Sequence, residues 1–549
     1  MKSISFKNFR RFTDFPELKF GDITILVGGN NAGKSTLVKA LLLVLDNLKT
    51  MRRDVNLDEN INIFQTLTSP EFRFDENTYH ELNIKNFSRA LNRHCDDGRM
   101  TFTLEVEHPL TNDVYKFEIV VSRYCAQDEN ADPNDDARGL IDFISVCNLT
   151  KDIQFDFSFT TWNGEASYMY VRIADASARE LAARIESLKQ EKNALTQYVK
   201  TIGPQLEAGS ILDLNAVNKL NDRKAELDKI EKVLKDITSA KDKAKDVEIK
   251  IPFSTTLDMT SKYLILDLIK DVIAYSGYSS SEKKGSKAYN QETANKELLQ
   301  AHKATMEAFS ADIRYLLDFF GVDYIQAHGV TQKTLFSTTD GIDHIAKTVK
   351  EFMQSRAWRN EKIRAFIRQW MSEFNIGYDF QIEDVDGEAY KVFILESPED
   401  KKGFPLADLG MGSIQLMMLL FALSTSIKHN IGSIFGKPTV VIEEPEQNLH
   451  PAVQSKLADI LFQVNKDFGL KFIIETHSEY LLREVQIIVA REKLVSLDKN
   501  PFRVYYFNAE TGPYDMGFQN NGKFIESFGP GFFDVADNAA LELFDYDEE

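Results

Sequence analysis

The sequence has few cysteines, no long apolar run and no excess of positive charge. Its three cysteines, Cys95, Cys125 and Cys147, lack the spacing of metal ligands and are too few for a disulfide framework, which fits a reducing compartment. The longest apolar runs, such as IQLMMLLFAL at 414–423, are shorter than the roughly 18–20 residues that cross a bilayer. The amino terminus has no signal-peptide hydrophobic region. These absences predict a cytoplasmic protein without a membrane segment.

The lack of positive charge also limits the partners of the protein. The formal net charge is −19. A surface with this average charge repels a polyanion, so nucleic-acid binding would need a local basic patch. The 549 residues, of which 43% are hydrophobic, are enough for a large core divided over two or three lobes. The composition therefore disfavours a general DNA-binding protein.

Hydrophobic periodicity predicts an α/β beginning followed by an antiparallel sheet. Residues 1–45 have the pattern of two strands, a loop and a helix: SISFKNF alternates, DITILVGG is continuously apolar, and KSTLVKALLLVL is apolar at helical spacing. Between 100 and 170, short runs such as TFTLEVE and FDFSFT alternate apolar and polar residues. Such alternation is typical of an antiparallel sheet with one buried face.

The middle of the chain is predicted to be helical. Leu and Ile residues keep a 3-4 spacing on both sides of a Gly/Pro-containing break at 203–210, which favours an antiparallel coiled-coil hairpin over an ordinary helical subdomain. The Ser/Lys/Gly-rich segment 276–296 predicts a loop or linker. Amphipathic helical stretches follow near 294–320 and 342–374, and α/β character returns from about 377.

A phosphate-binding loop is the strongest motif in the sequence. GGNNAGKST fits the pattern G-x-x-x-x-G-K-[ST], with a predicted strand before it and a predicted helix after it. In such a loop, backbone N–H groups and the helix N-terminus bind phosphate, the lysine reaches the β- and γ-phosphates, and the serine hydroxyl binds Mg²⁺. The predicted cofactors are therefore ATP and Mg²⁺, and the residues predicted to hold them are Gly28, Asn30, Asn31, Gly33, Lys34, Ser35 and Thr36.

Two adjacent acids end a second apolar strand. In TVVIEEPEQNLHP, Glu443 and Glu444 follow the apolar run directly. Adjacent side chains on a strand face opposite ways, so the two acids are expected to have different roles. We predict that Glu443 binds Mg²⁺ together with Ser35, and that Glu444 orients or deprotonates the attacking water.

A third apolar strand ends in a histidine. The stretch LKFIIETHSEYLL brings Thr476, His477 and Ser478 to the same predicted edge of the sheet. An imidazole at this position is suited to contact the γ-phosphate or the attacking water. We therefore predict that His477 takes part in catalysis with Glu444.

These motifs, in this order, resemble the ABC-type ATPase heads of the SMC and RecF-like superfamily, including OLD-like nucleases and prokaryotic defence ATPases. The resemblance rests on FKNFRRF near the start, the P-loop, LGMGSIQ at 409–415, VVIEEPEQNLHP and IIETHS. It implies an α/β head with an antiparallel β lobe, an inserted coiled-coil hairpin and a helical lobe. The implied segments are the N-terminal half of the head at 1–173, the hairpin at 174–246, the helical lobe and linker at 247–375, and the C-terminal half of the head at 376–549.

The resemblance also implies a nucleotide site shared by two heads. The signature loop of one head would cap the γ-phosphate of another, which assigns this role to Gly410, Gly412, Ser413 and Gln415. Gly410 stands where the family has a serine. Arg10 corresponds to an early basic residue near the nucleotide. Gln65 is the candidate for the glutamine that closes the Mg²⁺ site. In this arrangement ATP joins subunits, which implies a homodimer or a higher homo-oligomer.

The effector is expected to be a separate protein. OLD-like relatives carry a Toprim nuclease with an acidic metal site, but residues 478–549 contain no strand-borne Asp-x-Asp pair and have no room for such a domain. Among defence ATPases, the chain resembles the PtuA type of Septu systems, which acts with the HNH nuclease PtuB, and next the AriA type of PARIS systems, which holds a Toprim partner. Some Septu systems are retron-associated, which would add a reverse transcriptase and its non-coding RNA/DNA as partners.

The resemblance thus implies an ATPase subunit of an anti-phage complex that controls a nuclease. A RecF- or SMC-like DNA-repair ATPase that binds DNA directly is the alternative. The acidic composition and the short predicted hairpin weigh against that alternative. A transporter ATPase is disfavoured by the insertion and by Leu-His-Pro at 449–451, where transporters have Leu-Asp.

Overall fold

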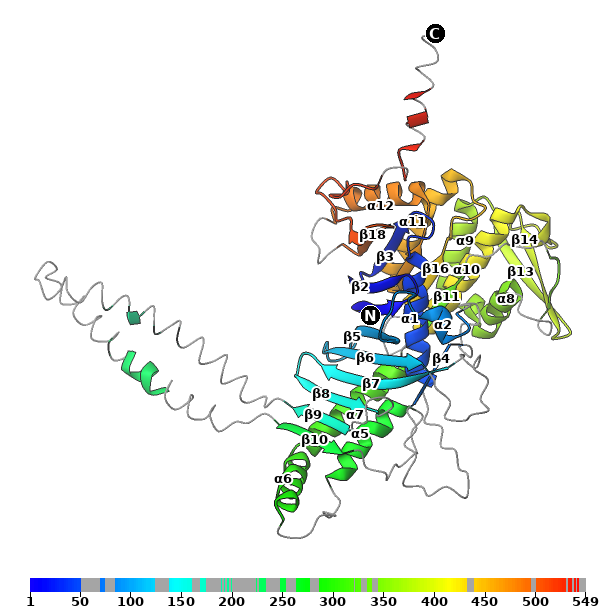
Figure 1. Ribbon diagram of the computed structural model, residues 1–549. Helices are drawn as coiled ribbons and strands as arrows, with labels where there is room; N and C mark the ends of the chain where they lie inside the picture. The colour runs from blue at the N-terminus through cyan, green and yellow to red at the C-terminus, as the bar shows by residue number, and fades with distance from the viewer. Residues whose placement is uncertain are drawn as a thin grey trace, which may run out of the picture.

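The computed structural model contains an α/β core, a large antiparallel lobe and a smaller antiparallel sheet (Figure 1). It describes residues 1–50, 70–74, 84–123, 138–159, 168–173, 247–252, 263–276, 286–319, 321–326, 333–337, 344–431, 439–494, 500–529 and 532–535, together with scattered positions between 189 and 233 and between 538 and 542. Gln65 lies outside the described residues, as does most of the predicted hairpin.

The core is a six-stranded sheet in the order β11-β16-β17-β3-β18-β19. Neighbouring strands from β11 to β18 pair in parallel, and β19 pairs antiparallel with β18. Every residue of β3 is buried, as expected of a central parallel strand. The sheet joins residues from both ends of the chain; its strands are β3 (Ile23–Gly28), β11 (Val322–Ile325), β16 (Thr439–Glu443), β17 (Lys471–Glu475), β18 (Phe502–Asn508) and β19 (Gly512–Asp515).

Four long helices pack around this sheet: α1 (Lys34–Thr50), α10 (Met411–Asn430), α11 (Pro451–Phe468) and α12 (Glu479–Arg491). Helix α1 is buried on almost all sides because it contacts β3 of the core, β1 of the antiparallel lobe and a helix of that lobe. Helix α10 alone among the described helices is long and apolar enough to cross a membrane, but 61% of that apolar stretch is buried inside the protein. Burial of this kind is typical of a core helix.

The antiparallel lobe is built on a nine-stranded sheet, ordered β10-β9-β8-β7-β6-β5-β1-β2 with β4 paired to β7. Buried and half-buried residues alternate along β5, because one face of the sheet packs on helices and the other faces solvent. The strands are β1 (Ser3–Phe9), β2 (Phe12–Lys19), β4 (Glu71–Arg73), β5 (Arg99–Glu107), β6 (Val114–Arg123), β7 (Arg138–Asn148), β8 (Ile153–Ser158), β9 (Tyr168–Ile173) and β10 (Val247–Pro252). The helices of this lobe are α2 (Phe87–Ala90), α5 (Leu264–Tyr275), α6 (Lys287–Ala301) and α7 (Lys303–Phe319).

A four-stranded antiparallel sheet lies beside the core, on the right in Figure 1. Asp379 is buried and accepts hydrogen bonds from Arg364 at 3.0 Å and Arg368 at 2.6 Å, which ties a helix to this sheet. The elements are β12 (Phe336–Ser337), β13 (Asp379–Val385), β14 (Ala389–Leu395), β15 (Phe404–Pro405), α8 (His344–Ser355), α9 (Glu361–Glu373) and the short 3₁₀ helices η2 (Ala357–Arg359) and η3 (Leu406–Asp408).

The predicted α/β class, first strands, P-loop helix and antiparallel sheet are confirmed. The loop predicted over 276–296 is wrong for 287–296, because Ser286 caps helix α6 by accepting a 3.0 Å hydrogen bond from the Tyr289 N–H. The helix predicted over 342–374 is interrupted at Arg356, which has a left-handed backbone conformation with φ of 56°.

The described residues of the predicted hairpin contact one another across its two arms. Leu195 and Ile230 are buried together with Leu227 beside them, and Lys192 forms a 2.9 Å ion pair with Glu231. These contacts join positions on both sides of the Gly/Pro break. Such contacts fit an antiparallel hairpin, which stays a prediction because most of the segment lies outside the described residues.

Tyr115 fastens α7 to the antiparallel sheet. Its hydroxyl is buried and donates a 2.6 Å hydrogen bond to the Asp312 carboxylate. We expect Tyr115→Phe to lower the free energy of unfolding by about 1.5–3 kcal/mol, because the hydrogen bond has a charged acceptor. Urea titration monitored by circular dichroism measures this change. Tyr378→Phe is the matched control: Tyr378 is 42% exposed, and a loss there equal to that of Tyr115→Phe would contradict the assignment.

Candidate functional site

The phosphate-binding loop lies between β3 and α1, against both ends of the chain. Gly28 has φ of 145°, and a Cβ there would lie 2.4 Å from the Phe507 carbonyl oxygen. Gly33 has φ of 111°, and a Cβ would lie 2.4 Å from the ring of Phe12. Only glycine has both the conformation and the space at these two positions. The loop backbone therefore packs closely between Phe507 of β18 and Phe12 at the start of β2.

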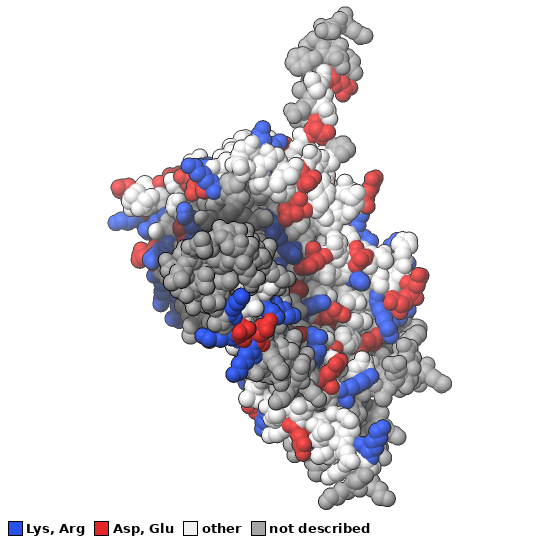
Figure 2. Space-filling model, turned by 90° about the vertical axis from the view of Figure 1, so that its left-hand side faces the viewer, with Lys and Arg blue, Asp and Glu red and all other residues white. Residues whose placement is uncertain are grey.

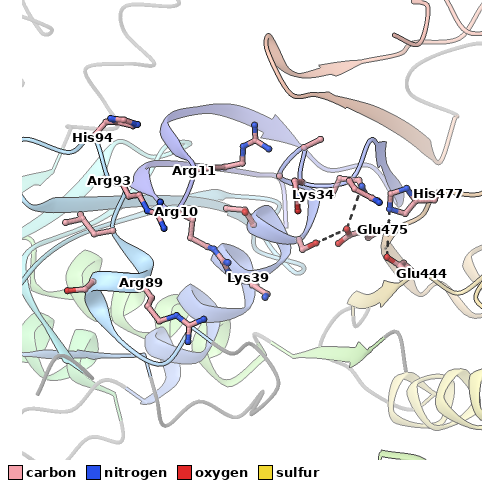
Figure 3. Close-up of a pocket in the computed structure, with 18 residues that line it drawn as sticks. Arg10, Arg11, Lys34, Lys39, Arg89, Arg93, His94, Glu444, Glu475 and His477 are labelled. Carbon is pink, nitrogen blue, oxygen red and sulfur yellow. Dashed lines mark hydrogen bonds and ion pairs between the residues drawn. The ribbon is translucent and has the colours of Figure 1, made fainter. Parts of the chain in front are cut away.

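A cavity of about 1110 Å³ opens over this loop (Figure 3). Most of the residues that the sequence assigns to the nucleotide line it: Arg10, Asn30, Asn31, Gly33, Lys34, Ser35 and Thr36. Glu444 and His477 line the same cavity, although they lie more than 400 residues further along the chain. The structure thus brings the P-loop and the second and third motifs together.

The Lys34 side chain folds back over the loop. It is 3% exposed, and its Nζ donates hydrogen bonds to the carbonyl oxygens of Gly28 at 3.0 Å and Gly29 at 3.1 Å. Burial lowers the pKa of Lys34, while nearby Glu475 has the opposite effect. Among the described residues, the polar partners of this buried ammonium are the two carbonyl oxygens and the Glu475 carboxylate at 3.9 Å. An ammonium in this environment is suited to an additional anionic ligand.

Glu475 is a site residue that the sequence analysis did not identify. Strand β17 lies between β16 and β3, so its last residue is closer to the P-loop than the last residue of β16. Glu475 is 5% exposed and accepts a 2.8 Å hydrogen bond from the Ser35 hydroxyl. The signal was present in the sequence, because an acid ends an apolar strand here just as Glu443 does.

The environment of Glu475 favours its neutral form. Burial raises the pKa of Glu475 to about 7, and the charges of Glu443 and Glu444 act in the same direction. The hydrogen bond from Ser35 and the charge of Lys34 oppose this rise. The region has more carboxylates than cations, which makes it a place where a cation would be stabilised.

Glu443 and Glu444 face different cavities. Glu444 has a left-handed φ of 44°, and its N–H donates a 2.7 Å hydrogen bond to the Glu475 carbonyl oxygen, which turns its side chain to the P-loop cavity. Gln447 holds the Glu444 carboxylate through a 2.6 Å hydrogen bond. Glu443, at the end of β16, lines a second cavity of about 490 Å³ beside α8 and α10. The different orientations fit different roles, and the metal role of Glu443 stays a prediction.

His477 lies at the mouth of the site opposite Glu444. Its Nε2 is 3.9 Å from the Glu444 carboxylate, and its backbone N–H donates a 2.6 Å hydrogen bond to Glu446. Burial, followed by the charge of Lys34, lowers the pKa of His477. The imidazole is therefore kept neutral near pH 7, with a nitrogen lone pair available to a ligand.

The signature residues do not line the P-loop cavity. Gly410 is exposed and is the N-cap residue of helix α10, where it has no side chain to accept a hydrogen bond from the first turn. Gly412 packs closely against the segment that follows Glu444, since a Cβ at Gly412 would lie 2.8 Å from the Asn448 carbonyl oxygen. Ser413 belongs to the first turn of the same helix. Gly410, Gly412 and Ser413 therefore lie outside the cavity that the P-loop of their own chain forms.

The end of the P-loop cavity that lies away from Glu444 and His477 is basic. Arg10 lies there together with Lys39 of α1 and with Arg89 and Arg93 from α2 and the residues after it (Figure 3). Burial and the neighbouring charge of Arg89 lower the pKa of Arg10. Of these four residues, only Arg10 is predicted from the sequence, because the other three positions belong to no motif.

Comparisons with known proteins identify the family of the chain. A family model described as "AAA ATPase domain" matches residues 1–482. No curated protein sequence matches the chain. Among solved structures, an SmcHead crystallised with the C-winged helix domain of ScpA is similar, with a TM-score of 0.35 and 10% sequence identity, and the match covers 94% of this chain and 98% of that chain.

The raised pKa of Glu475 predicts a pH-dependent stability in the absence of metal and nucleotide. Between the usual carboxyl pKa of 4.5 and about 7, the folded state keeps a proton that the unfolded state loses. The raised pKa of Glu475 therefore contributes about 3 kcal/mol to the free energy of unfolding at low pH. This contribution is fully present below pH 4.5 and is lost as pH rises through 7. Urea titrations in EDTA measure this effect. The free energy of unfolding of Glu475→Gln should exceed that of wild type by an amount that grows from pH 5 to pH 8.

The matched control for this experiment is Glu479→Gln, four residues further on α12. Glu479 is paired with Arg483 on the surface and lies outside the cavity. Its stability difference from wild type should be small at every pH. A difference between wild type and Glu475→Gln that does not change with pH would contradict the raised pKa.

Proposed function

The chain belongs to the family described as AAA ATPase domain, and we propose that it binds ATP with Mg²⁺ in the cavity over the P-loop and hydrolyses the ATP. The observation that carries this proposal is the convergence of the P-loop, Glu444 and His477 on one cavity. The backbone N–H groups of the loop, the N-terminus of α1 and the Lys34 ammonium are complementary to phosphate oxygens. Arg10, Asn30, Asn31 and Thr36 complete the proposed nucleotide contacts.

The donor atoms near Ser35 fit a Mg²⁺ ion. The Ser35 hydroxyl and the surrounding carboxylates are hard oxygen ligands, which Mg²⁺ prefers. One Glu475 carboxylate oxygen is buried without a hydrogen-bond partner among the described residues. A nearby cation would offset the cost of burying it. Ser35 and Glu443 remain the proposed ligands from the sequence. A bound Mg²⁺ would neutralise charge on the β- and γ-phosphates.

Glu444 is the proposed base for the attacking water. Its carboxylate faces the cavity, and Gln447 and the Glu475 carbonyl oxygen hold its side chain and its backbone. A carboxylate in a fixed position is able to orient a water and accept its proton. His477, held neutral beside Glu444, is the proposed contact to the γ-phosphate.

The proposed active form is a homodimer or a higher homo-oligomer. Gly410, Gly412 and Ser413 lie at the helix N-terminus of α10, outside the P-loop cavity of their own chain. A helix N-terminus is complementary to phosphate, so the phosphate would come from the nucleotide of a second subunit. ATP bound between two chains would couple nucleotide binding to association.

We further propose that this ATPase is the regulatory subunit of an anti-phage complex with a separate nuclease, of the HNH type or else the Toprim type. A retron association, with a reverse transcriptase and its non-coding RNA/DNA, is a further form of the same proposal. Its support is the set of motifs that the sequence shares with defence ATPases. Co-purification with the products of neighbouring genes tests it: co-elution of a nuclease supports the proposal, and a stable assembly without a nuclease contradicts it.

A DNA-repair ATPase that binds DNA directly is the second candidate. The basic end of the cavity favours it, with Arg10, Lys39, Arg89 and Arg93 in one place. The net charge of −19 opposes it, and on the face shown in Figure 2 acidic and basic side chains lie interspersed. Salt-dependent binding of duplex DNA by the isolated protein would favour this candidate over the first.

Lys34→Ala should abolish most ATP binding. The variant removes the only lysine within the P-loop motif, and with it the charge that balances the phosphates. We expect the dissociation constant for ATP, measured by titration calorimetry, to rise by about tenfold or more. Lys7→Ala is the control, because Lys7 is exposed on β1 and outside the cavity. Equal affinity of Lys34→Ala and wild type would disprove the P-loop assignment.

Glu444→Gln should bind ATP and slow its hydrolysis by roughly 100-fold or more, because an amide accepts no proton from water. Phosphate release measures the rate, and light scattering with ATP present measures the molar mass. We expect the variant to accumulate as a dimer or larger oligomer with ATP. If Glu443→Gln loses hydrolysis with ATP retained and Glu444→Gln does not, the two roles are reversed.

A further inference from the structure

Three side chains beside the P-loop have the geometry of a metal site. One ligand atom from each of Glu444, Glu475 and His477 lies within 4.8 Å of the corresponding atoms of the other two. The three residues follow or end β16 and β17, which are paired in parallel, so their side chains meet at one edge of the sheet. Figure 3 shows the three side chains close together beside Lys34.

A second observation favours a cation at this cluster. The Glu475 side chain is 6% exposed, and one of its oxygens accepts the hydrogen bond from Ser35. Its other oxygen, Oε2, is buried without a hydrogen-bond partner among the described residues. A buried carboxylate oxygen in this condition is costly unless a cation compensates it. The Lys34 ammonium, 3.9 Å from Oε1, is too far for a hydrogen bond.

The donor set is more specific than that of a magnesium site. Glu444 and Glu475 supply oxygen, and His477 supplies an imidazole nitrogen. Mg²⁺ is bound by oxygen ligands, whereas divalent transition metals accept carboxylate and imidazole together. The neutral form of His477 is the form that binds a metal. A mixed set of this kind therefore favours a divalent transition-metal ion over Mg²⁺.

We propose that Glu444, Glu475 and His477 form a site for a divalent transition-metal ion, with Mn²⁺ as the test ion, next to the proposed nucleotide phosphates. The inference rests on the proposed function for its consequence, because an ion there would face the γ-phosphate end of ATP. Binding of the ion needs no nucleotide, since all three ligands belong to the folded chain. Glu444 and His477 are also the proposed base and the proposed γ-phosphate contact, so the ion is proposed for the nucleotide-free protein, and ATP and the ion should weaken each other's binding.

The test is binding of Mn²⁺ to the full-length, nucleotide-free protein at pH 8, measured by loss of the free-ion signal in electron paramagnetic resonance. Wild type should bind the ion, and Glu475→Gln should weaken binding by roughly 10- to 100-fold or more. Glu479→Gln is the matched control and should bind as wild type does. Glu475→Asp keeps the charge and should retain part of the affinity, and thermal unfolding shows whether each variant is folded.

Pulsed electron paramagnetic resonance tests whether His477 is a direct ligand, because a purely structural effect would not change the coupling of Mn²⁺ to a nitrogen nucleus. Bound Mn²⁺ should show coupling to a nitrogen nucleus, and His477→Gln should remove it. Equal Mn²⁺ affinity in wild type and a folded Glu475→Gln, or wild-type Mn²⁺ without nitrogen coupling, would overturn the inference.

ATP affinity measured without metal separates this inference from the proposed function. Absent or Glu475-independent Mn²⁺ binding in a protein that still binds ATP overturns the metal site alone. Glu475-dependent Mn²⁺ binding in a protein that binds no ATP supports the metal site and overturns the proposed ATPase.

Discussion

The parallel pairing of β16, β17 and β3 is the constraint on which the candidate site depends. The register aligns Glu443 with Glu475, and Glu475 with Leu26 two residues before the P-loop. Because parallel strands end at one edge of the sheet, the acids of the last two motifs and the phosphate loop of the first meet there. A shift of register by one residue would turn these side chains to the other face of the sheet.

Charge compensation then determines how the site is arranged. Lys34 and Glu475 are both buried, and each moderates the cost of burying the other. The compensation is incomplete, because Glu444 and Glu443 add negative charge near Glu475 while Arg10, Lys39 and Arg89 gather at the other end of the cavity. The cavity thus has an acidic end suited to a cation and a basic end suited to an anion, which is the polarity that a metal–nucleotide complex requires.

How well each part of the structure is predicted from the sequence depends on whether local or long-range interactions determine it. The P-loop was predicted correctly as a strand, a loop and a helix because its glycines satisfy local backbone requirements, as at Gly28 and Gly33. The antiparallel sheet was predictable from the alternation along strands such as β5. The helix at 287–296 was not, because its Ser286 cap lies in a polar segment whose composition is also typical of a loop. Glu475 was not identified because its role depends on which strand lies next to β3.

The sequence by itself determined the chemistry of the chain: a phosphate loop, acids and a histidine at the ends of apolar strands, and an α/β class, since these depend on short-range patterns of residues. The tertiary structure alone decided which of these residues share a cavity. It placed β17 between β16 and β3, turned Glu444 and not Glu443 to the P-loop cavity, and brought Lys39 and Arg89 beside Arg10. Strand order and backbone turns join residues hundreds of positions apart, and no local pattern encodes such a meeting.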